Sequence, residues 1–130
     1  MSGDVTLTDT SMYGVFRDSV VELRAIVGDG QPQGTVVTWR GVLVEFDEER
    51  NCWPIGTDAP LPNTIARVVT IIQDLNPASN HTSVTYELRG GVRPEPFPYS
   101  IDVRADKGKA HYVITFVFTL TAEDEENGDA

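Results

Sequence analysis

The clearest alternation of apolar and polar side chains runs from 111 to 121, near the C-terminal end of the chain. Large apolar residues occupy one parity, while valine and threonine occupy most of the other. The large apolar set is Tyr112, Ile114, Phe116, Phe118 and Leu120. A two-residue period rich in β-branched and aromatic residues is typical of a strand with one buried face. The pattern predicts a strand whose apolar side packs on a second layer.

A second alternating segment, 97–104, lies just upstream and is joined to the first through Lys107-Gly108. Glycine adopts the positive φ that a two-residue turn requires, so the two segments are predicted to form a hairpin. In this register every pair on one face is apolar: Val103 with Tyr112, Ile101 with Ile114, Tyr99 with Phe116, and Phe97 with Phe118. A shift by one residue would oppose apolar and polar side chains. Pro98 cannot donate a ladder hydrogen bond, which favours an edge position for the first strand.

Further strands are predicted in the middle of the chain. Segment 35–47 is apolar on one parity before Arg40-Gly41 and on the other parity after it. A bulge at this glycine would return the apolar side chains to one face. Segment 83–89 also alternates, and Gly90-Gly91 ends it. The proline-marked segments 48–63 and 76–82 are predicted to be loops.

Two segments fit either a helix or a strand. Apolar residues in 63–75 recur at helical spacing, but seven of the twelve residues from Thr64 to Leu75 are β-branched, which favours a strand. Segment 11–27 also has a helical apolar set, although Gly14 costs a helix about 1 kcal/mol relative to alanine. We favour a strand over 20–27 that turns through 28–34 into the next strand.

These elements predict a mainly β chain, with a single antiparallel β-sandwich-like domain of about six strands. The alternative is an α+β domain in which helices near 11–27 and/or 63–75 pack on an antiparallel sheet. The domain is expected to cover 1–122, a length that suits one domain. The segment 123–130 contains five acidic residues and no basic one, and we expect it to be a disordered tail. The hairpin register places its start near Arg93 and Arg89, where a loose contact is expected.

The charge of the whole chain narrows the choice of partners. The sequence has 20 acidic and 10 basic residues, a formal charge of −10. This charge repels a phosphate backbone, so nucleic-acid binding is disfavoured. The start of the chain lacks the basic and apolar regions of a signal peptide, and no apolar run approaches the ~20 residues that span a bilayer. The chain is therefore expected in the cytoplasm or as part of a virion, away from membranes.

Residues that could carry chemistry are few. The sequence has no nucleophile elbow, phosphate-binding glycine loop or HExxH motif. His81, His111 and Cys52 stand singly, without metal-ligand spacing, so no metal, cofactor or catalytic residue is predicted. Cys52 is interpreted as an unreactive loop cysteine, since Glu48 and Glu49 would raise a thiol pKa. Trp53 is the one interface candidate, because tryptophan is enriched at binding hot spots, although it could equally cap the core.

The sequence thus favours a non-catalytic protein-binding or assembly module whose partners are other protein subunits, including a possible homo-oligomer. Small acidic β domains of this kind occur in virus and phage particles, an analogy at the level of fold only. The alternative is a small-ligand-binding protein or a hydrolase that uses loop carboxylates with His81 or His111 as the base.

Overall fold

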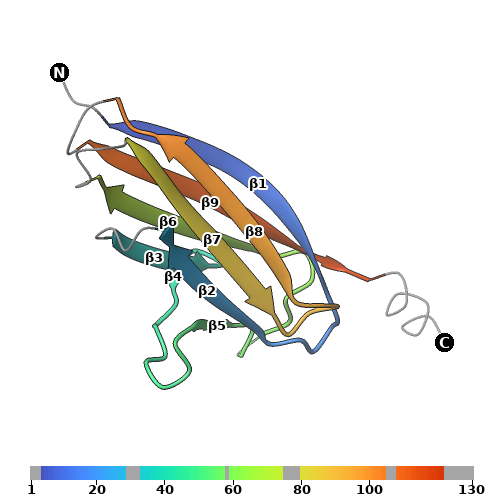
Figure 1. The fold of residues 1–130 in the computed structure, drawn as a ribbon. Coiled ribbons are helices and arrows are strands. Elements are labelled where there is room, and N and C mark those ends of the chain that lie inside the picture. Colours follow the sequence, from blue (N-terminus) through green and yellow to red (C-terminus); the bar gives the residue numbers. More distant parts are fainter. Residues whose placement is uncertain (1–3, 29–32, 58, 75–79, 105–107, 122–130) are drawn as a thin grey trace.

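A computed structural model describes residues 4–28, 33–57, 59–74, 80–104 and 108–121. Within these residues the chain forms nine strands and no α-helix (Figure 1). The strands are β1 (Val5–Val15), β2 (Val21–Val27), β3 (Gln33–Trp39), β4 (Val42–Leu43), β5 (Trp53–Ile55), β6 (Ile65–Gln73), β7 (His81–Arg89), β8 (Glu95–Asp102) and β9 (Lys109–Leu120). The mainly β prediction is confirmed, with nine strands in place of about six.

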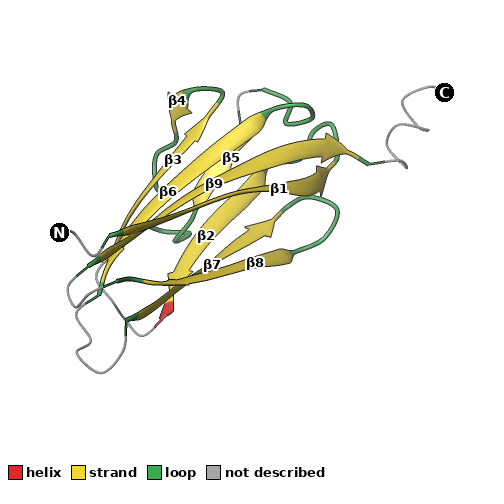
Figure 2. Ribbon diagram, turned by 90° about the horizontal axis from the view of Figure 1, so that it is seen from above, coloured by secondary structure: helices red, strands yellow, loops and turns green. Residues whose placement is uncertain are grey.

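The strands form two sheets that pack face to face as a sandwich. The five-stranded sheet has the order β1-β9-β6-β3-β4, and the four-stranded sheet has the order β5-β2-β7-β8. Figure 2 shows β2, β7 and β8 in a layer apart from β1, β9 and β6. All pairs are antiparallel except β1 with β9, which run parallel along their whole contact. One parallel pair therefore departs from the all-antiparallel expectation.

The core consists of the inward-facing apolar side chains of both sheets. Phe116 of the five-stranded sheet lies 5.1 Å, between ring centroids, from Phe97 and 6.0 Å from Tyr86, both of the four-stranded sheet. Buried tyrosine hydroxyls also join the sheets, because Tyr86 donates to Thr70 Oγ1 and the Tyr112 hydroxyl lies 2.7 Å from Thr82 Oγ1. Buried polar groups that are paired in this way avoid the cost of an unmade hydrogen bond.

The predicted hairpin through Lys107-Gly108 is wrong, although both of its strands exist. β8 pairs with β7 in one sheet, and β9 pairs with β6 and β1 in the other. Lys107 itself lies outside the described residues. The apolar faces of β8 and β9 do meet, but across the core rather than side by side, as the contact of Phe97 with Phe116 shows. Matched apolar faces satisfy either arrangement, so the pattern could not separate them.

The ambiguous segments are strands. Segment 63–75 contains β6, as favoured, and segment 11–27 contains the end of β1 and all of β2. The α+β alternative is therefore wrong. The predicted hairpin from 20–27 into the next strand is also wrong, because β2 and β3 belong to different sheets. Of the connection 28–34, residues 29–32 lie outside the described residues.

Three boundaries differ from expectation. Arg40 and Gly41 have φ angles of 55° and 78° and form a two-residue turn, not a bulge, because Trp39 pairs with Val42. Two positive φ angles suit the twist of a tight hairpin. β5 lies within the predicted loop 48–63, and β7 begins at His81, inside the predicted loop 76–82. The tail 123–130 lies outside the described residues. Among the residues that are described, no helix is long and apolar enough to cross a membrane.

Candidate protein-binding surface

The β3–β4 hairpin carries two uncovered apolar side chains. β4 is two residues long and pairs only with β3, and among the described residues no further strand of the sheet lies beyond it. Val42 is 67% exposed and Leu43 is 64% exposed. Large apolar side chains that stay in water gain nothing from the hydrophobic effect until another surface covers them. The hairpin therefore presents apolar area that folding leaves unburied.

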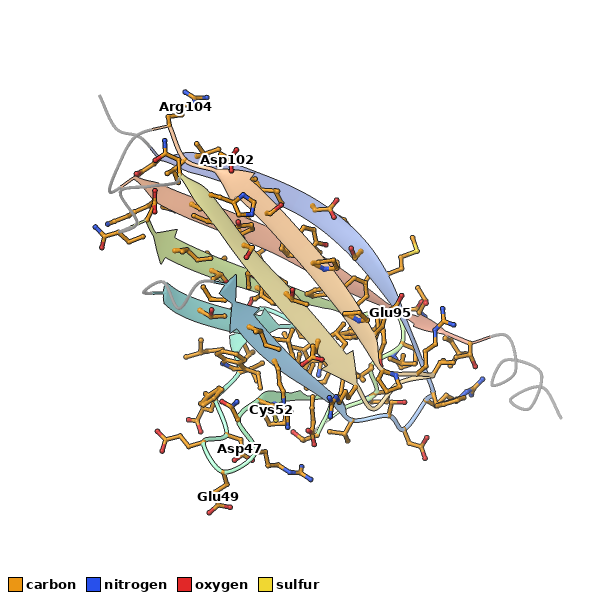
Figure 3. All side chains as sticks on the ribbon, in the orientation of Figure 1. Asp47, Glu49, Cys52, Glu95, Asp102 and Arg104 are labelled. Atoms are coloured by element: carbon orange, nitrogen blue, oxygen red, sulfur yellow. The ribbon has the colours of Figure 1, made fainter. Side chains whose placement is uncertain are left out.

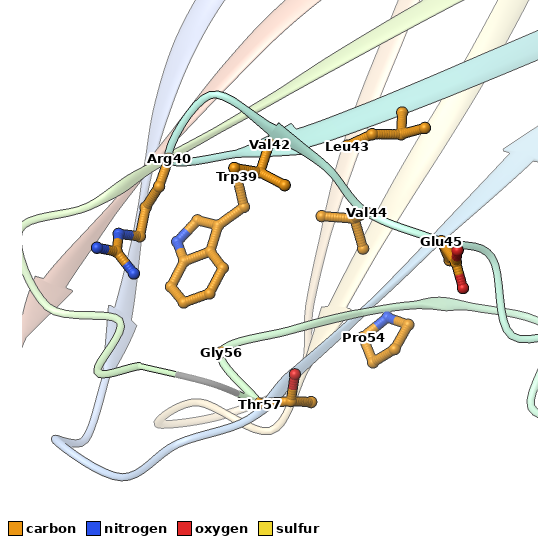
Figure 4. A pocket seen from close by; sticks show the side chains of 9 residues that line it. All are labelled: Trp39, Arg40, Val42, Leu43, Val44, Glu45, Pro54, Gly56 and Thr57. Atoms are coloured by element: carbon orange, nitrogen blue, oxygen red, sulfur yellow. The ribbon is translucent and has the colours of Figure 1, made fainter.

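A pocket of about 470 Å³ lies beside this hairpin. Figure 4 shows Val42 and Val44 on one side of it and Pro54 and Thr57 on the other. The lining residues are Trp39, Arg40, Val42, Leu43, Val44, Glu45, Pro54, Gly56 and Thr57. Trp39 is nearly buried, and its indole N–H donates to Thr64 Oγ1 at 2.8 Å. The floor of the pocket is thus a fixed aromatic ring.

The chain after β4 adds a second aromatic group. Phe46, 41% exposed, packs edge-on against Trp53 with ring centroids 4.7 Å apart. The turn that follows is held by Asp47, whose Oδ1 accepts hydrogen bonds from the amides of Glu49 and Arg50 at 3.1 and 3.2 Å. Trp53 is half-buried against the core. We call the group Trp39, Val42, Leu43, Val44, Phe46, Trp53 and Pro54 the apolar tip.

Trp53, the predicted interface candidate, thus lies within the apolar tip. The other exposed members, Val42, Leu43 and Phe46, were not predicted. A bulge near Gly41 would have placed Val42 and Phe46 on the apolar face, and Leu43 was not assigned to that face. A two-residue turn ending in glycine between alternating segments was the available signal.

A second feature is the outer face of the five-stranded sheet, which carries no carboxylate on its strands. Side chains alternate between the two sides of a strand, so the residues between the core positions point outward. They are Thr6, Thr8, Thr10 and Met12 of β1; Lys109, His111, Val113, Thr115, Val117 and Thr119 of β9; Ile65, Arg67, Val69 and Ile71 of β6; Gly34, Val36 and Thr38 of β3; and Leu43 of β4. We call this surface the acid-free face. It adjoins the apolar tip through Leu43.

The acid-free face contains several exposed apolar side chains. Met12 is 70% exposed, and Val36, Ile65 and Ile71 are each more than one-third exposed. Asp4 contacts one end of this face, where its carboxylate lies 3.6 Å from His111 Nε2 and accepts the Lys109 amide at 2.8 Å. In a chain of net charge −10, a sheet face whose strands point no acidic side chain outward repels another acidic chain less than a face with exposed carboxylates does.

Cys52 lies beneath the turn that begins at Asp47, with which it forms an isolated bridge (Figure 3). It is a free cysteine with no exposed surface. Burial raises the pKa of the thiol, and the carboxylates of Glu22 and Asp47 raise it further. A thiol with a raised pKa is a poor nucleophile at neutral pH.

The histidines lie at strand positions away from the apolar tip. His81 Nδ1 is 2.9 Å from Asp102 Oδ1 at one end of the four-stranded sheet, and His111 belongs to the other sheet. Figure 3 shows Asp102 far from Asp47 and Glu49, so His81 is not brought to the acidic turn. Within the described part of the chain, no three His, Cys, Asp or Glu side chains gather where they could hold a metal ion.

In comparisons with known proteins, no family model, curated protein or solved structure matches this chain.

Proposed function

We propose that this protein is a non-catalytic binding module, a subunit or accessory component of a larger protein assembly such as a virus or phage particle. The exposed β3–β4 hairpin carries the proposal, because Val42 and Leu43 stand in water beside a pocket with a tryptophan floor. Interface cores are enriched in aromatic residues, and the apolar tip contains three of them, Trp39, Phe46 and Trp53. The partner is a protein subunit, either another chain or a second copy.

The sheet edges favour contact through side chains over the addition of a strand. β4 and β5, the two edges nearest the apolar tip, have two and three residues. The edge strand β8 contains Pro96 and Pro98, which have no N–H to offer an incoming strand. On the same side of the sandwich, the hydroxyls of Ser11 and Tyr99 lie 2.8 Å apart and join β1 to β8. A partner therefore gains more from covering the apolar tip than from pairing with these edges.

Substitution of the hairpin tests the proposal. The double variant Val42→Ser and Leu43→Ser removes exposed apolar area without opening the core, so unfolding free energy should change by less than about 1 kcal/mol. The matched control is Val92→Ser, at a site that is 49% exposed and outside the apolar tip. Sedimentation velocity measures self-association, and chemical crosslinking in the source cells measures hetero-association. We expect the hairpin variant to lose at least about tenfold in affinity, equivalent to about 1.4 kcal/mol. Equal association of the wild-type chain, the hairpin variant and the Val92→Ser control would refute the proposal.

A further inference from the structure

A basic hollow lies at the end of the acid-free face, next to the apolar tip. Its volume is about 490 Å³, and its lining residues are Thr38, Arg40, Gly41, Asn63, Thr64, Ile65 and Arg67. Arg40 extends from the β3–β4 turn, and Arg67 from the neighbouring strand β6, where it pairs with Thr38. Two arginines therefore line one hollow, and its lining includes no acidic residue.

Neither arginine is neutralised within the described part of the chain. No described carboxylate forms an ion pair with Arg40 or Arg67, whereas Arg50 pairs with Glu22 at 3.3 Å and Arg89 pairs with Glu87 at 3.9 Å. The Arg40 guanidinium lies 5.5 Å from the centre of the Trp39 ring, which holds the charge beside the hollow. Guanidinium groups match carboxylates through paired hydrogen bonds, so the hollow suits an acidic polypeptide segment.

The chain supplies such a segment close by. Residues 123–130 contain five acids and no base, and they follow Thr121, the last described residue. The loop that lines the hollow is tied to this end of β9, because the Asn63 amide donates to the Phe118 carbonyl at 2.9 Å. The hollow and the start of the acidic segment thus lie at the same end of the five-stranded sheet.

The distance can be covered by the segment itself. Val117 is the ladder partner of Ile65, and Thr121 lies four residues further along the chain, one residue past the end of β9, which is about 13 Å at 3.3 Å per residue. β6 separates β9 from β3, which adds about 10 Å sideways. The resulting span of about 16 Å equals the reach of about five extended residues. Residues 123–130 are therefore long enough to reach the arginines from Thr121.

We infer that the acidic segment 123–130 of this chain binds the Arg40/Arg67 hollow within the same molecule. Attachment to β9 gives the segment an effective concentration in the millimolar range, so even a weak carboxylate–guanidinium contact is populated. Because Arg40 lines both the hollow and the pocket of the apolar tip, the bound segment would lie beside the proposed partner surface. The contact itself does not depend on that proposed function.

A nitroxide on the acidic segment tests the contact in the full chain. Asn127→Cys provides the attachment site, and the wild-type chain, whose Cys52 is buried, is treated identically as the control. Relaxation of the backbone amides is measured by NMR. We expect enhancement at Gly41 and Arg67 in low salt, and its loss in about 1 M salt, where the screening length is about 3 Å. The double variant Arg40→Gln and Arg67→Gln should also lose it, whereas Arg93→Gln should retain it.

Two other results would overturn the inference. Enhancement confined to Gly14, Val92 and Arg93 would mean that the segment contacts only residues near the end of β9. This is the contact with Arg93 that the sequence predicted. Enhancement seen only when spin-labelled chains are mixed with isotope-enriched chains would mean that the segment binds a second molecule. Retention of the signal in the Arg40→Gln and Arg67→Gln variant would assign the contact to other residues.

Discussion

The two outer faces of the sandwich cover the same core but differ in charge. The four-stranded sheet presents Glu22, Glu87 and Asp102 outward, and each has a cationic or histidine partner within 4.0 Å. The five-stranded sheet presents mainly valine, isoleucine and threonine outward, and none of the outward positions of its strands carries a carboxylate; Asp9 of β1 lies at a position of the opposite parity, paired with Ile114. The first face is suited to water, because its charges remain solvated. The second can be covered by another protein without burial of an unpaired carboxylate, which would be costly.

The difference cannot be explained by the needs of the fold. Both sheets place alternating apolar residues on the inside, and threonine or charged residues on the outside would serve equally well for solubility. Exposed Met12, Val36, Ile65 and Ile71 contribute little to the core from their positions on the outer side. We therefore propose that these residues, together with the apolar tip, form a protein-binding surface.

The largest expected effect is on stability, where a substitution in the core should cost far more than one on an outer face. Phe116 contacts aromatic rings of the opposite sheet, so Phe116→Ala should lower the free energy of unfolding by about 3–5 kcal/mol. Ile71→Ser, on the acid-free face, should cost less than about 1 kcal/mol. Urea denaturation followed by tryptophan fluorescence measures both. A comparable loss in the two variants would show that the acid-free face does support the fold.

Carboxylates added to each outer face test the comparison itself. Val36→Glu with Ile71→Glu places acids on the acid-free face, and Ser83→Glu with Thr85→Glu adds the same charge to the outside of β7. We expect association to fall at least about tenfold in the first pair, equivalent to about 1.4 kcal/mol, because binding would bury unpaired charges. The second pair should associate normally in sedimentation velocity and crosslinking. Loss of association in both would indicate simple charge repulsion.

Alkaline pH tests the buried hydroxyls that join the two sheets. Burial raises the pKa of Tyr86 and of Tyr112 above the usual value, so the folded chain retains protons that the unfolded chain releases. Their contribution to stability is complete below about pH 10 and is lost as the pH rises further. Tyr86→Phe should lower stability by about 1 kcal/mol at pH 7 through loss of its bond to Thr70, and should flatten the alkaline decline. Urea midpoints measured from pH 7 to 11 give both quantities. If stability fell with pH as steeply in Tyr86→Phe as in the wild type, the proposed contribution of the Tyr86 hydroxyl would be contradicted.

Cys52 gives the smallest predicted effect, which is kinetic. Because the thiol is buried and its pKa is raised, a disulfide reagent should react with it only through opening of the chain. The rate of labelling at pH 8 should therefore rise with urea concentration in step with unfolding. Rapid labelling of the native chain would show that the turn over Cys52 opens locally.

The sequence predicted individual strands better than their neighbours. Alternation is a local property, so the strands at 83–89 and 111–121 could be predicted from it. Segment 63–75 has apolar residues at helical spacing, and only its content of β-branched residues favoured a strand. Which strands are neighbours in a sheet depends on contacts between distant segments. The apolar sides of β8 and β9 match equally well as neighbours in one sheet or as facing surfaces across the core. The parallel pairing of β1 with β9 has no local signal either.

The candidate surface was predicted only at Trp53. Val42 and Leu43 follow a turn in which Arg40 has a positive φ. Residues other than glycine seldom adopt such an angle, so the sequence at Arg40 did not predict this turn. The acid-free face emerges only once β1, β9, β6 and β3 are placed side by side, since its residues come from four distant segments. The charge pattern along the chain does not reveal it.

Oxidative footprinting of the protein within its native assembly tests the central claim most directly. The account predicts that Leu43, Phe46 and Met12, which are exposed in the isolated chain, become protected relative to that chain. Ile26, 52% exposed on the outside of β2, should remain reactive. Protection of Ile26 with undiminished oxidation of Leu43 and Met12 would place the partner on the charged face and contradict the account.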